Sequence, residues 1–431
     1  FSSRRRHTRS TLQSRGLGDV YKRQVPYLRR SGELAAARYA NEEAAEYLSR
    51  ALDLTPRSDA SERYSLLRLR ERVYDMQGER EAQQRDQAAL EALAEALDDA
   101  DPLPAHSRRA EVALRRAARA EVTGDYGAAV IAARQAIDLA QAADDVPGET
   151  NGYLHWGGAL WRQGDCAGAG PHLERALRLA REASLPRAEA NCLRNLGVVA
   201  DRCGDFGQAR DYLEQALHAF RAVGDRQGES AAVNSLGAVS AGQGDLSQAR
   251  RYFEQALAVY REIGDRWGEG AALSNLGQVC SDQGQLLDAR RYLQDALRLC
   301  REIEDREGEG AALTNLGEIA SELGDHGAAK THFEQAVALL HDIGDRRVEG
   351  FALGGLGLVH LRLGDYGPAG EHLQRGLDLL HEIDDPQGEG LLLSYRGLLL
   401  HRLGDAEAAR ETSQQAVRIA KEIGDRRTQA Y

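Results

Sequence analysis

Apolar residues recur along this chain at the spacing of amphipathic helices. One stretch of 40 residues, 225–264, shows the pattern in both of its halves. In the first half Val233, Leu236 and Gly237 fall at positions i, i+3 and i+4, with polar residues between them. The second half follows the same spacing with Leu246, Ala249, Phe253, Ala256, Leu257 and Tyr260. Each half therefore predicts a helix with one buried face.

This two-helix unit repeats with a period of 40 residues, marked by three series of small residues. The first series is Gly157, Gly197, Gly237, Gly277, Gly317, Gly357 and Gly397. The second is Gly124, Gly164, Gly204, Gly244, Gly284, Gly324, Gly364 and Gly404, and the third is Ala129, Ala169, Ala209, Ala249, Ala289, Ala329, Ala369 and Ala409. Aspartate follows every glycine of the second series except Gly284. Because glycine can end a helix and aspartate can cap the next one, each Gly-Asp pair predicts a helix end and a helix start.

These patterns predict an all-α fold, a solenoid (superhelix) of antiparallel helical hairpins. A single hairpin cannot bury its apolar face alone, so neighbouring hairpins must stack. Gly237 and Ala249 are expected where the two helices of a hairpin approach closely, with Phe253 filling the space around them.

The same residues resemble the tetratricopeptide repeat family, whose signature is W-x2-L-G-x2-Y followed by A-x3-F and a further alanine. Leu236 and Gly237 supply the L-G pair, and Ala249, Phe253 and Ala256 supply the rest. The tryptophan, tyrosine and proline of the signature are replaced here by Val233, Ser240 and Arg261. The 40-residue period most resembles the Leu-Gly-Asn repeat adaptors of spindle orientation and the repeat arms of bacterial signalling regulators.

The repeat pattern divides the chain into segments of different regularity. Residues 106–424 are predicted to form eight regular hairpins, and residues 25–98 two degenerate ones with a turn near Gly78. Residues 425–431 look like the truncated start of a further repeat. The segment that begins at Val25 resembles the entry to the repeat arm of large bacterial signal-transduction ATPases. This resemblance implies that a nucleotide-binding domain, with or without a cyclase or DNA-binding domain, precedes the repeats.

Residues 1–24 differ from the rest of the chain and carry a net charge of +6. They resemble translated sequencing adapter, most clearly at residues 19–24, which read DVYKRQ and match a transposase end sequence. We predict that the segment is an artefact and disordered, and that the natural protein begins upstream of Val25. The alternative is a genuine basic arm that binds nucleic acid or anionic lipid.

The sequence lacks the residues that common catalytic chemistries require. Its three lysines are Lys22, Lys330 and Lys421, and none follows glycine, so a phosphate-binding Walker A loop is excluded. HExxH, GxSxG and SxxK motifs are absent. The carboxylates recur with the repeat and are interpreted as helix-start charges, as at Glu229, Glu269, Glu309, Glu349 and Glu389. We therefore predict that this chain is not an enzyme and binds no cofactor.

Charge and cysteine usage narrow the partners further. The net charge is −12, or −18 without residues 1–24, and no basic stripe is present, so direct nucleic-acid binding is not expected. The chain contains no apolar run long enough for a membrane span and no secretory leader, which predicts a cytoplasmic protein. Five cysteines without a CxxC motif are expected to be small core residues. The histidines concentrated in the last third are interpreted as surface residues, and no metal site is predicted.

The predicted function is to bind a protein or peptide in the concave groove, as the sensor or scaffold arm of a larger bacterial regulator. The alternatives are a fragment of a signalling enzyme, an ATPase or a nucleotide cyclase whose catalytic domain lies upstream of residue 25, and a free-standing adaptor. The sequence names no partner and leaves the oligomeric state open.

The family resemblance implies that the asparagine before each Leu-Gly pair lines the concave groove. Asn195, Asn275 and Asn315 occupy this position, and an amide there can donate to and accept from a peptide backbone. The residues expected to add specificity on the same face are Gln278, Glu318, Glu322, Arg362 and Arg402. The alternative is that the asparagines solvate the surface or tie adjacent helices together. Trp267 stands at a position that is polar in the other repeats and is a candidate interface anchor, or packs on a neighbouring loop.

Overall fold

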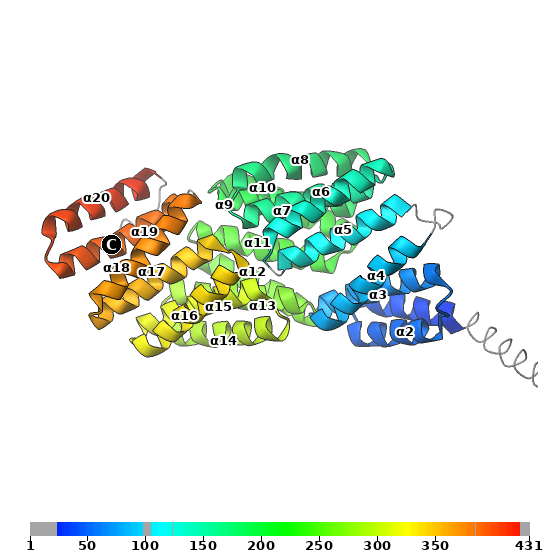
Figure 1. The fold of residues 1–431 in the computed structure, drawn as a ribbon, viewed down its shortest axis with the longest axis horizontal. Helices are drawn as coiled ribbons and strands as arrows, with labels where there is room; N and C mark the ends of the chain where they lie inside the picture. Colours follow the sequence, from blue (N-terminus) through cyan, green and yellow to red (C-terminus); the bar gives the residue numbers. More distant parts are fainter. Residues whose placement is uncertain (1–23, 98–104, 123, 384, 423–431) are drawn as a thin grey trace, which may run out of the picture.

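The protein folds as a superhelix of stacked helical hairpins (Figure 1). The computed structural model describes residues 24–97, 105–122, 124–383 and 385–422. In these ranges the regular secondary structure is helical, without strands. The segments 1–23 and 423–431, on which the predictions of an artefact and of a truncated repeat fall, lie outside the described residues.

Two N-terminal hairpins precede the regular repeats. The first joins a helix at 24–37 to α2 (Asn41–Leu54), and the second joins α3 (Ala60–Gln77) to α4 (Arg80–Ala96). The first four regular hairpins are α5 (Ala105–Val122) with α6 (Tyr126–Ala142), α7 (Val146–Arg162) with α8 (Cys166–Glu182), α9 (Pro186–Arg202) with α10 (Phe206–Val223), and α11 (Arg226–Gly242) with α12 (Leu246–Ile263). The next four are α13 (Arg266–Asp282) with α14 (Leu286–Glu302), α15 (Arg306–Glu322) with α16 (His326–Ile343), α17 (Arg346–Leu363) with α18 (Tyr366–Glu382), and α19 (Pro386–Leu403) with α20 (Ala406–Glu422).

The Gly-Asp pairs end and start helices as predicted. Gly264 has a φ of 69° and forms the left-handed C-cap of α12, and the next residue, Asp265, accepts a hydrogen bond from the Gly268 amide at 2.9 Å. At Asp144, Ser184 and Glu304 a residue other than glycine adopts the left-handed conformation. Each cap satisfies backbone groups that a helix end leaves unpaired.

Small residues allow the two helices of each hairpin to approach closely. A Cβ atom added at Gly317 would lie 2.8 Å from the ring of Phe333, and one added at Gly237 would lie 2.6 Å from the ring of Phe253. Ala249 is completely buried beside that ring. The predicted close approach of the two helices is therefore confirmed.

The periodic glutamates have a packing partner that the sequence did not reveal. Arg221 donates to Glu229 at 2.8 Å, across the junction between one hairpin and the next. Equivalent ion pairs with the same spacing of eight positions join Arg181 to Glu189, Arg261 to Glu269 and Arg301 to Glu309. These glutamates therefore join adjacent hairpins as well as starting helices.

The superhelix winds tightly enough for its second turn to pack on its first. Asn41 donates from its side-chain nitrogen to the Ile263 carbonyl at 3.2 Å, across 222 residues. Arg80 donates from Nε to the Ile303 carbonyl at 3.1 Å, across 223 residues. One turn therefore takes between five and six repeats of 40 residues, and α3 comes to lie against α13 (Figure 1).

We call this packing the inter-turn contact. It places Asn41, Gly78, Arg80 and Gly124 of the first turn against Ile263, Ile303 and Ile343 of the second. Two of its glycines lie directly against isoleucines. A Cβ atom added at Gly78 would lie 2.4 Å from Cγ2 of Ile303, and one added at Gly124 would lie 2.9 Å from Cβ of Ile343. The equivalent glycines of later hairpins have open space at this position: Gly164, Gly204, Gly244, Gly284, Gly324, Gly364 and Gly404.

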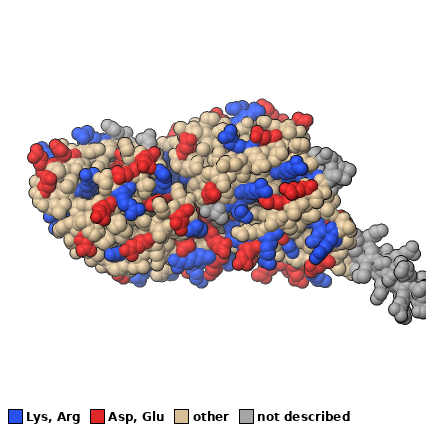
Figure 2. All heavy atoms as spheres, in the orientation of Figure 1, with Lys and Arg blue, Asp and Glu red and all other residues tan. Residues whose placement is uncertain are grey.

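Both signs of charge are interspersed over the face of the molecule shown in Figure 2. None of the helices in the described ranges is both long and apolar enough to cross a membrane. Cys192, Cys280 and Cys300 are buried, but Cys203 is exposed at the end of α9, so its assignment to the core was wrong. The reason is its position in the turn that follows the helix, where the buried face has ended.

Candidate functional site

The odd-numbered helices α5 to α19 form the inner, concave face of the superhelix. Each contacts the next odd-numbered helix as well as its hairpin partner, whereas the described even-numbered helices do not pack on one another in this way. The stack must therefore curve with its odd-numbered helices inside. Residues of these helices that face away from their hairpin partners line the interior.

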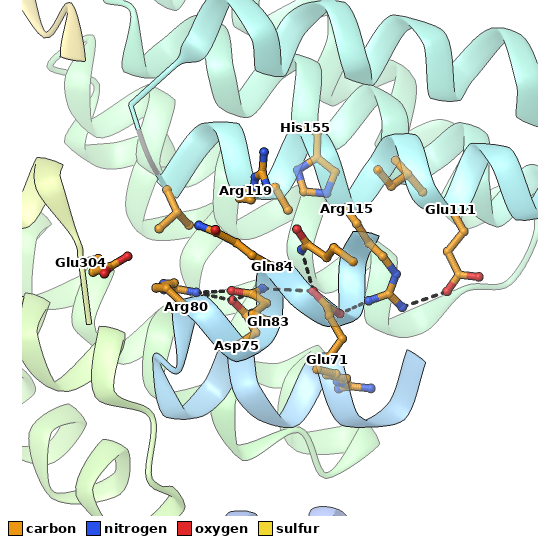
Figure 3. Close-up of a pocket in the computed structure, with 15 residues that line it drawn as sticks. Glu71, Asp75, Arg80, Gln83, Gln84, Glu111, Arg115, Arg119, His155 and Glu304 are labelled. Atoms are coloured by element: carbon orange, nitrogen blue, oxygen red, sulfur yellow. Dashed lines mark hydrogen bonds and ion pairs between the residues drawn. The ribbon is translucent and has the colours of Figure 1, made fainter. Parts of the chain in front are cut away.

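A pocket of about 340 Å³ opens on this face where α5 meets the α3–α4 hairpin (Figure 3). Its floor is apolar and consists of Leu114, Ala118 and Val122, which fall at i, i+4 and i+8 on one side of α5. Its walls carry polar side chains: Glu71, Arg72, Asp75, Arg80, Gln83, Gln84, Gln87, Glu111, Arg115, Arg119, His155 and Glu304. The pocket thus combines an apolar floor with polar walls, a combination typical of ligand sites.

Buried Glu71 organises the polar wall next to α5. Its carboxylate accepts from the Gln83 amide at 3.0 Å, from the Gln87 amide at 2.8 Å and from the Arg115 guanidinium. Arg115 also donates to Glu111 at 3.0 Å. Burial lowers the pKa of Arg115 to about 10 and raises that of Glu111. The network fixes the position of Arg115 between Glu71 and Glu111 (Figure 3). Leu114 and Ala118 of the same helix also line the pocket.

The mouth of the pocket is completed by the second turn of the superhelix. Arg80 pairs with Asp75 at 2.8 Å on one side, and on the other His155 Nδ1 lies 2.7 Å from Glu121 Oε1. Glu304 reaches the mouth from the turn between α14 and α15, directly after the isoleucine that contacts Gly78. The inter-turn contact is thus part of the site, since it brings Glu304 to the pocket.

Arginines continue along the inner face beyond the pocket. Arg162 donates to Glu121 at 2.9 Å and lies 4.0 Å from Glu307 of the second turn. Burial lowers the pKa of Arg194, and the positive charge of Arg162 adds to the effect. Arg202 is exposed to solvent, but the protein that surrounds the inner face, and then the neighbouring guanidinium of Arg347, lower its pKa. This part of the groove has donors available for carbonyl or carboxylate oxygens.

The predicted groove residues occupy the same repeat positions as the residues of the pocket. Asn195, Asn275 and Asn315 correspond to Arg115, and Gln278 and Glu318 correspond to Ala118. Glu322, Arg362 and Arg402 correspond to Val122. They therefore lie along the inner face, on α9, α13, α15, α17 and α19, and do not converge on one point.

Several of these side chains have partners within the protein. Asn275 donates to the Asn234 side chain at 3.3 Å, which ties α13 to α11. Gln278 donates to Asp282 at 3.1 Å, and Arg362 donates to the Ser321 carbonyl at 2.9 Å. Asn195 and Asn315 are half-buried, and Glu318, Glu322 and Arg402 are exposed. Trp267 is 41% exposed at the start of α13.

The wall of the pocket was not predicted from the sequence. Residues 25–98 predict two degenerate repeats, and none of their side chains stands out as functional in the repeat pattern. The signal was present in α4, where Gln83 and Gln87 precede Leu90 and Ala94 on the buried face of the helix. Amides at buried positions of an amphipathic helix indicate a polar network.

The described residues contain no group of three histidine, cysteine or acidic side chains that could hold a metal ion. The late histidines were expected to lie on the surface, and for His360 this prediction was wrong. His360 is buried, and its ring stacks on that of His372 with the ring centroids 5.4 Å apart.

A superhelix of stacked helical hairpins defines a helical-repeat protein of the solenoid class. Tetratricopeptide repeats match residues 149–222, 202–262, 228–302, 268–342 and 349–422. The chain therefore belongs to the tetratricopeptide repeat family. A comparison with the curated proteins finds no match.

Solved structures share the fold at low sequence identity. A Rap protein complexed with Competence and Sporulation Factor is 14% identical, with 84% of this chain and 98% of that chain covered and a TM-score of 0.59. The Rap conjugation gene regulator of plasmid pLS20, in complex with the Phr* peptide, is 14% identical, with 84% and 96% covered and a TM-score of 0.54. A signal transduction ATPase with a tetratricopeptide repeat sensor, from Pyrococcus horikoshii, is 14% identical, with 88% of this chain and 59% of that chain covered and a TM-score of 0.53.

Proposed function

We propose that this chain binds an extended peptide along its inner face, with one apolar peptide side chain in the pocket over α5. The observation that carries the proposal is the pocket itself, whose apolar floor of Leu114, Ala118 and Val122 is left uncovered beside a fixed polar wall. Exposed apolar surface rimmed by polar groups is typical of a binding site. The half-buried asparagines further along the face can donate to and accept from a peptide backbone.

The comparisons support this proposal at the level of the fold. Two of the similar structures are complexes, one with Competence and Sporulation Factor and one with the Phr* peptide. A third uses tetratricopeptide repeats as the sensor of an ATPase. We infer that this chain is the non-catalytic sensor or interaction arm of a larger cytoplasmic regulator in a bacterium, which responds to a peptide or a protein segment.

Selection from a library of displayed peptides tests the proposal directly. Peptides of random sequence are selected on the immobilised full chain, and their affinities are measured by fluorescence anisotropy. Replacing Asn195, Asn275 and Asn315 with alanine removes up to three hydrogen bonds of about 0.5–1.5 kcal/mol each, so affinity should fall about tenfold or more. The matched control replaces three exposed glutamines of the outer helices: Gln215, Gln255 and Gln335.

The control variant should bind the selected peptides as the unchanged protein does. Equal affinity of the unchanged protein and the asparagine variant would contradict the assignment of these amides to the groove. Failure to select any peptide would contradict the proposed function as a whole.

A further inference from the structure

Cys166 and Cys203 stand at two positions that pack on each other in the superhelix. Cys166 is the first residue of α8, and Cys203 directly follows α9 in the next hairpin. One repeat later, Phe206 is the first residue of α10, and a Cβ atom added at Gly242, the last residue of α11, would lie 2.6 Å from its ring. The first residue of an even-numbered helix therefore lies against the end of the next odd-numbered helix.

Cysteine is confined to one instance of this contact. The position of Cys166 carries Tyr126, Phe206, Leu246, Leu286, His326, Tyr366 and Ala406 in the other repeats, and that of Cys203 carries Gln163, Gln243, Gln283, Leu323, Leu363 and Leu403. Both positions are cysteine only where α8 begins beside the end of α9. The two cysteines thus fall on one pair of contacting positions.

The surroundings of the two thiols make them accessible and close. Cys203 is exposed and Cys166 is half-buried, whereas Cys192, Cys280 and Cys300 are buried. The thiols of Cys166 and Cys203 lie near enough to interact directly. Burial, and then the Cys203 thiol, raise the pKa of Cys166 to about 11. Cys203 is therefore the thiol that a reagent in solution meets first, and Cys166 is the second thiol within its reach.

We propose that Cys166 and Cys203 form a reversible disulfide bond by exchange with a small-molecule disulfide such as oxidised glutathione. The Cys203 thiolate attacks one sulfur of the small disulfide, whose S–S bond breaks and releases one small thiol. The Cys166 thiolate then attacks Sγ of Cys203, and the second small thiol leaves. The two protein thiols are thereby oxidised, and their two electrons and two protons leave with the two small thiols.

The bond joins two hairpins that line the groove. It links the start of α8 to the end of α9, and so ties the α7–α8 hairpin to the α9–α10 hairpin. The inner helices of these hairpins, α7 and α9, end at Arg162 and Arg202, next to the two cysteines. Oxidation therefore limits the movement of one inner helix relative to the next, and reduction restores it.

Incubation of the full chain with oxidised glutathione tests the proposal. Free thiols are then blocked with N-ethylmaleimide, and the digested protein is analysed by mass spectrometry. The unchanged protein should yield a linked pair of peptides, one with Cys166 and one with Cys203, at a rate that is independent of protein concentration. Dithiothreitol should reverse the link. The oxidised protein should melt at a higher temperature than the reduced protein, because the bond constrains the unfolded chain.

Single variants separate the two steps of the exchange. Cys166→Ser should stop the reaction at a glutathione adduct on Cys203, since no second thiol displaces the glutathione. Cys203→Gln introduces the residue of neighbouring repeats and should leave Cys166 at least about tenfold less reactive than Cys203, because Cys166 is half-buried. Cys280→Ser is the matched control, since the previous repeat carries Ser240 at this position, where its hydroxyl donates to the Leu236 carbonyl at 2.9 Å.

The control variant should form the link as the unchanged protein does. A glutathione adduct on Cys203 of the unchanged protein without the link to Cys166 would overturn the proposal. A link only between two molecules, or no reaction at all, would overturn it as well. Equal melting temperatures of the linked and reduced forms would contradict the tie between the two hairpins.

Discussion

Single glycines decide how closely the helices of each hairpin approach. Gly317 faces the ring of Phe333, and a Cβ atom there would lie 2.8 Å from it. Gly170, within α8, has nothing within 4 Å of its Cβ position. Two helical glycines therefore have opposite expected responses to a larger side chain.

Gly317→Leu should lower the free energy of unfolding by about 1–3 kcal/mol, because it overpacks the contact with Phe333. Gly170→Ala should raise it by about 0.4–1 kcal/mol through reduced backbone entropy of the unfolded chain. Urea denaturation followed by circular dichroism measures both. An unchanged midpoint for Gly317→Leu would show that the glycine is not at a tight contact.

Two cap aspartates near the inter-turn contact provide a pH-dependent contribution to stability. Burial raises the pKa of Asp305 to about 6 and that of Asp345 to about 6, from an ordinary value of 3.8. Around Asp305 the negative charge of Glu307 acts in the same direction, and Arg80 and Arg162 oppose it. The folded state therefore binds these protons more tightly than the unfolded state.

Stability from these two protons is lost as pH rises through about 6. Relative to a variant with Asp305→Asn and Asp345→Asn, the unchanged protein should lose stability between about pH 4 and about pH 7, by at most ~3 kcal/mol per carboxyl. Denaturant unfolding of both proteins across this range measures the difference. A difference that is independent of pH would contradict the burial of these carboxyls.

At the scale of elements, the turns within hairpins are of two kinds. Some pack against an isoleucine of the second turn of the superhelix, and others face open space. Gly78 and Gly204 both have positive φ, at 70° and 79°. Only Gly78 faces an isoleucine of the second turn, and Gly204 faces open space. Comparing these two positions separates the strain of the turn from the inter-turn contact.

Gly204→Ala should cost about 1–2 kcal/mol, because a residue with a Cβ atom is strained in the left-handed conformation. Gly78→Ala should cost about 1–3 kcal/mol more, because its Cβ atom also overlaps Ile303. Hydrogen exchange followed by mass spectrometry should show faster exchange in α2, α3 and α4 for Gly78→Ala alone. Equal exchange in the two variants would mean that the second turn does not hold the first.

The sequence predicted these elements well because their signals are local. Apolar spacing, Gly-Asp pairs and the small residue before each tight contact lie within one 40-residue unit, so hairpins such as α11–α12 follow directly. The polar wall of the pocket was not predicted, because Glu71, Gln83 and Arg115 meet only when α3, α4 and α5 pack together. The residues predicted for the groove share a helix face with Arg115, but the repeat pattern carries no sign of the pocket itself.

At the scale of the whole molecule, small rotations between repeats add up to a superhelix whose turns touch. No single repeat encodes this closure, so the periodic pattern alone could not predict it. One sign of the closure is visible in the sequence, in the turns between successive hairpins. The residue there is Ala143, Ala183 or Val223 in the earlier repeats and isoleucine at 263, 303 and 343. Those isoleucines pack on the first turn and help to complete the mouth of the pocket.

The central claim is that a ligand enters the pocket on the inner face, and the affinity of a selected peptide for a filled pocket tests it most directly. Ala118→Trp places a large side chain on the pocket floor, whereas Ile131→Trp makes a similar change on the outer helix α6. We expect the first variant to weaken peptide binding by at least about tenfold, or about 1.4 kcal/mol, and the second to leave it unchanged. Equal affinity of both variants and the unchanged protein, with their melting temperatures preserved, would contradict the account.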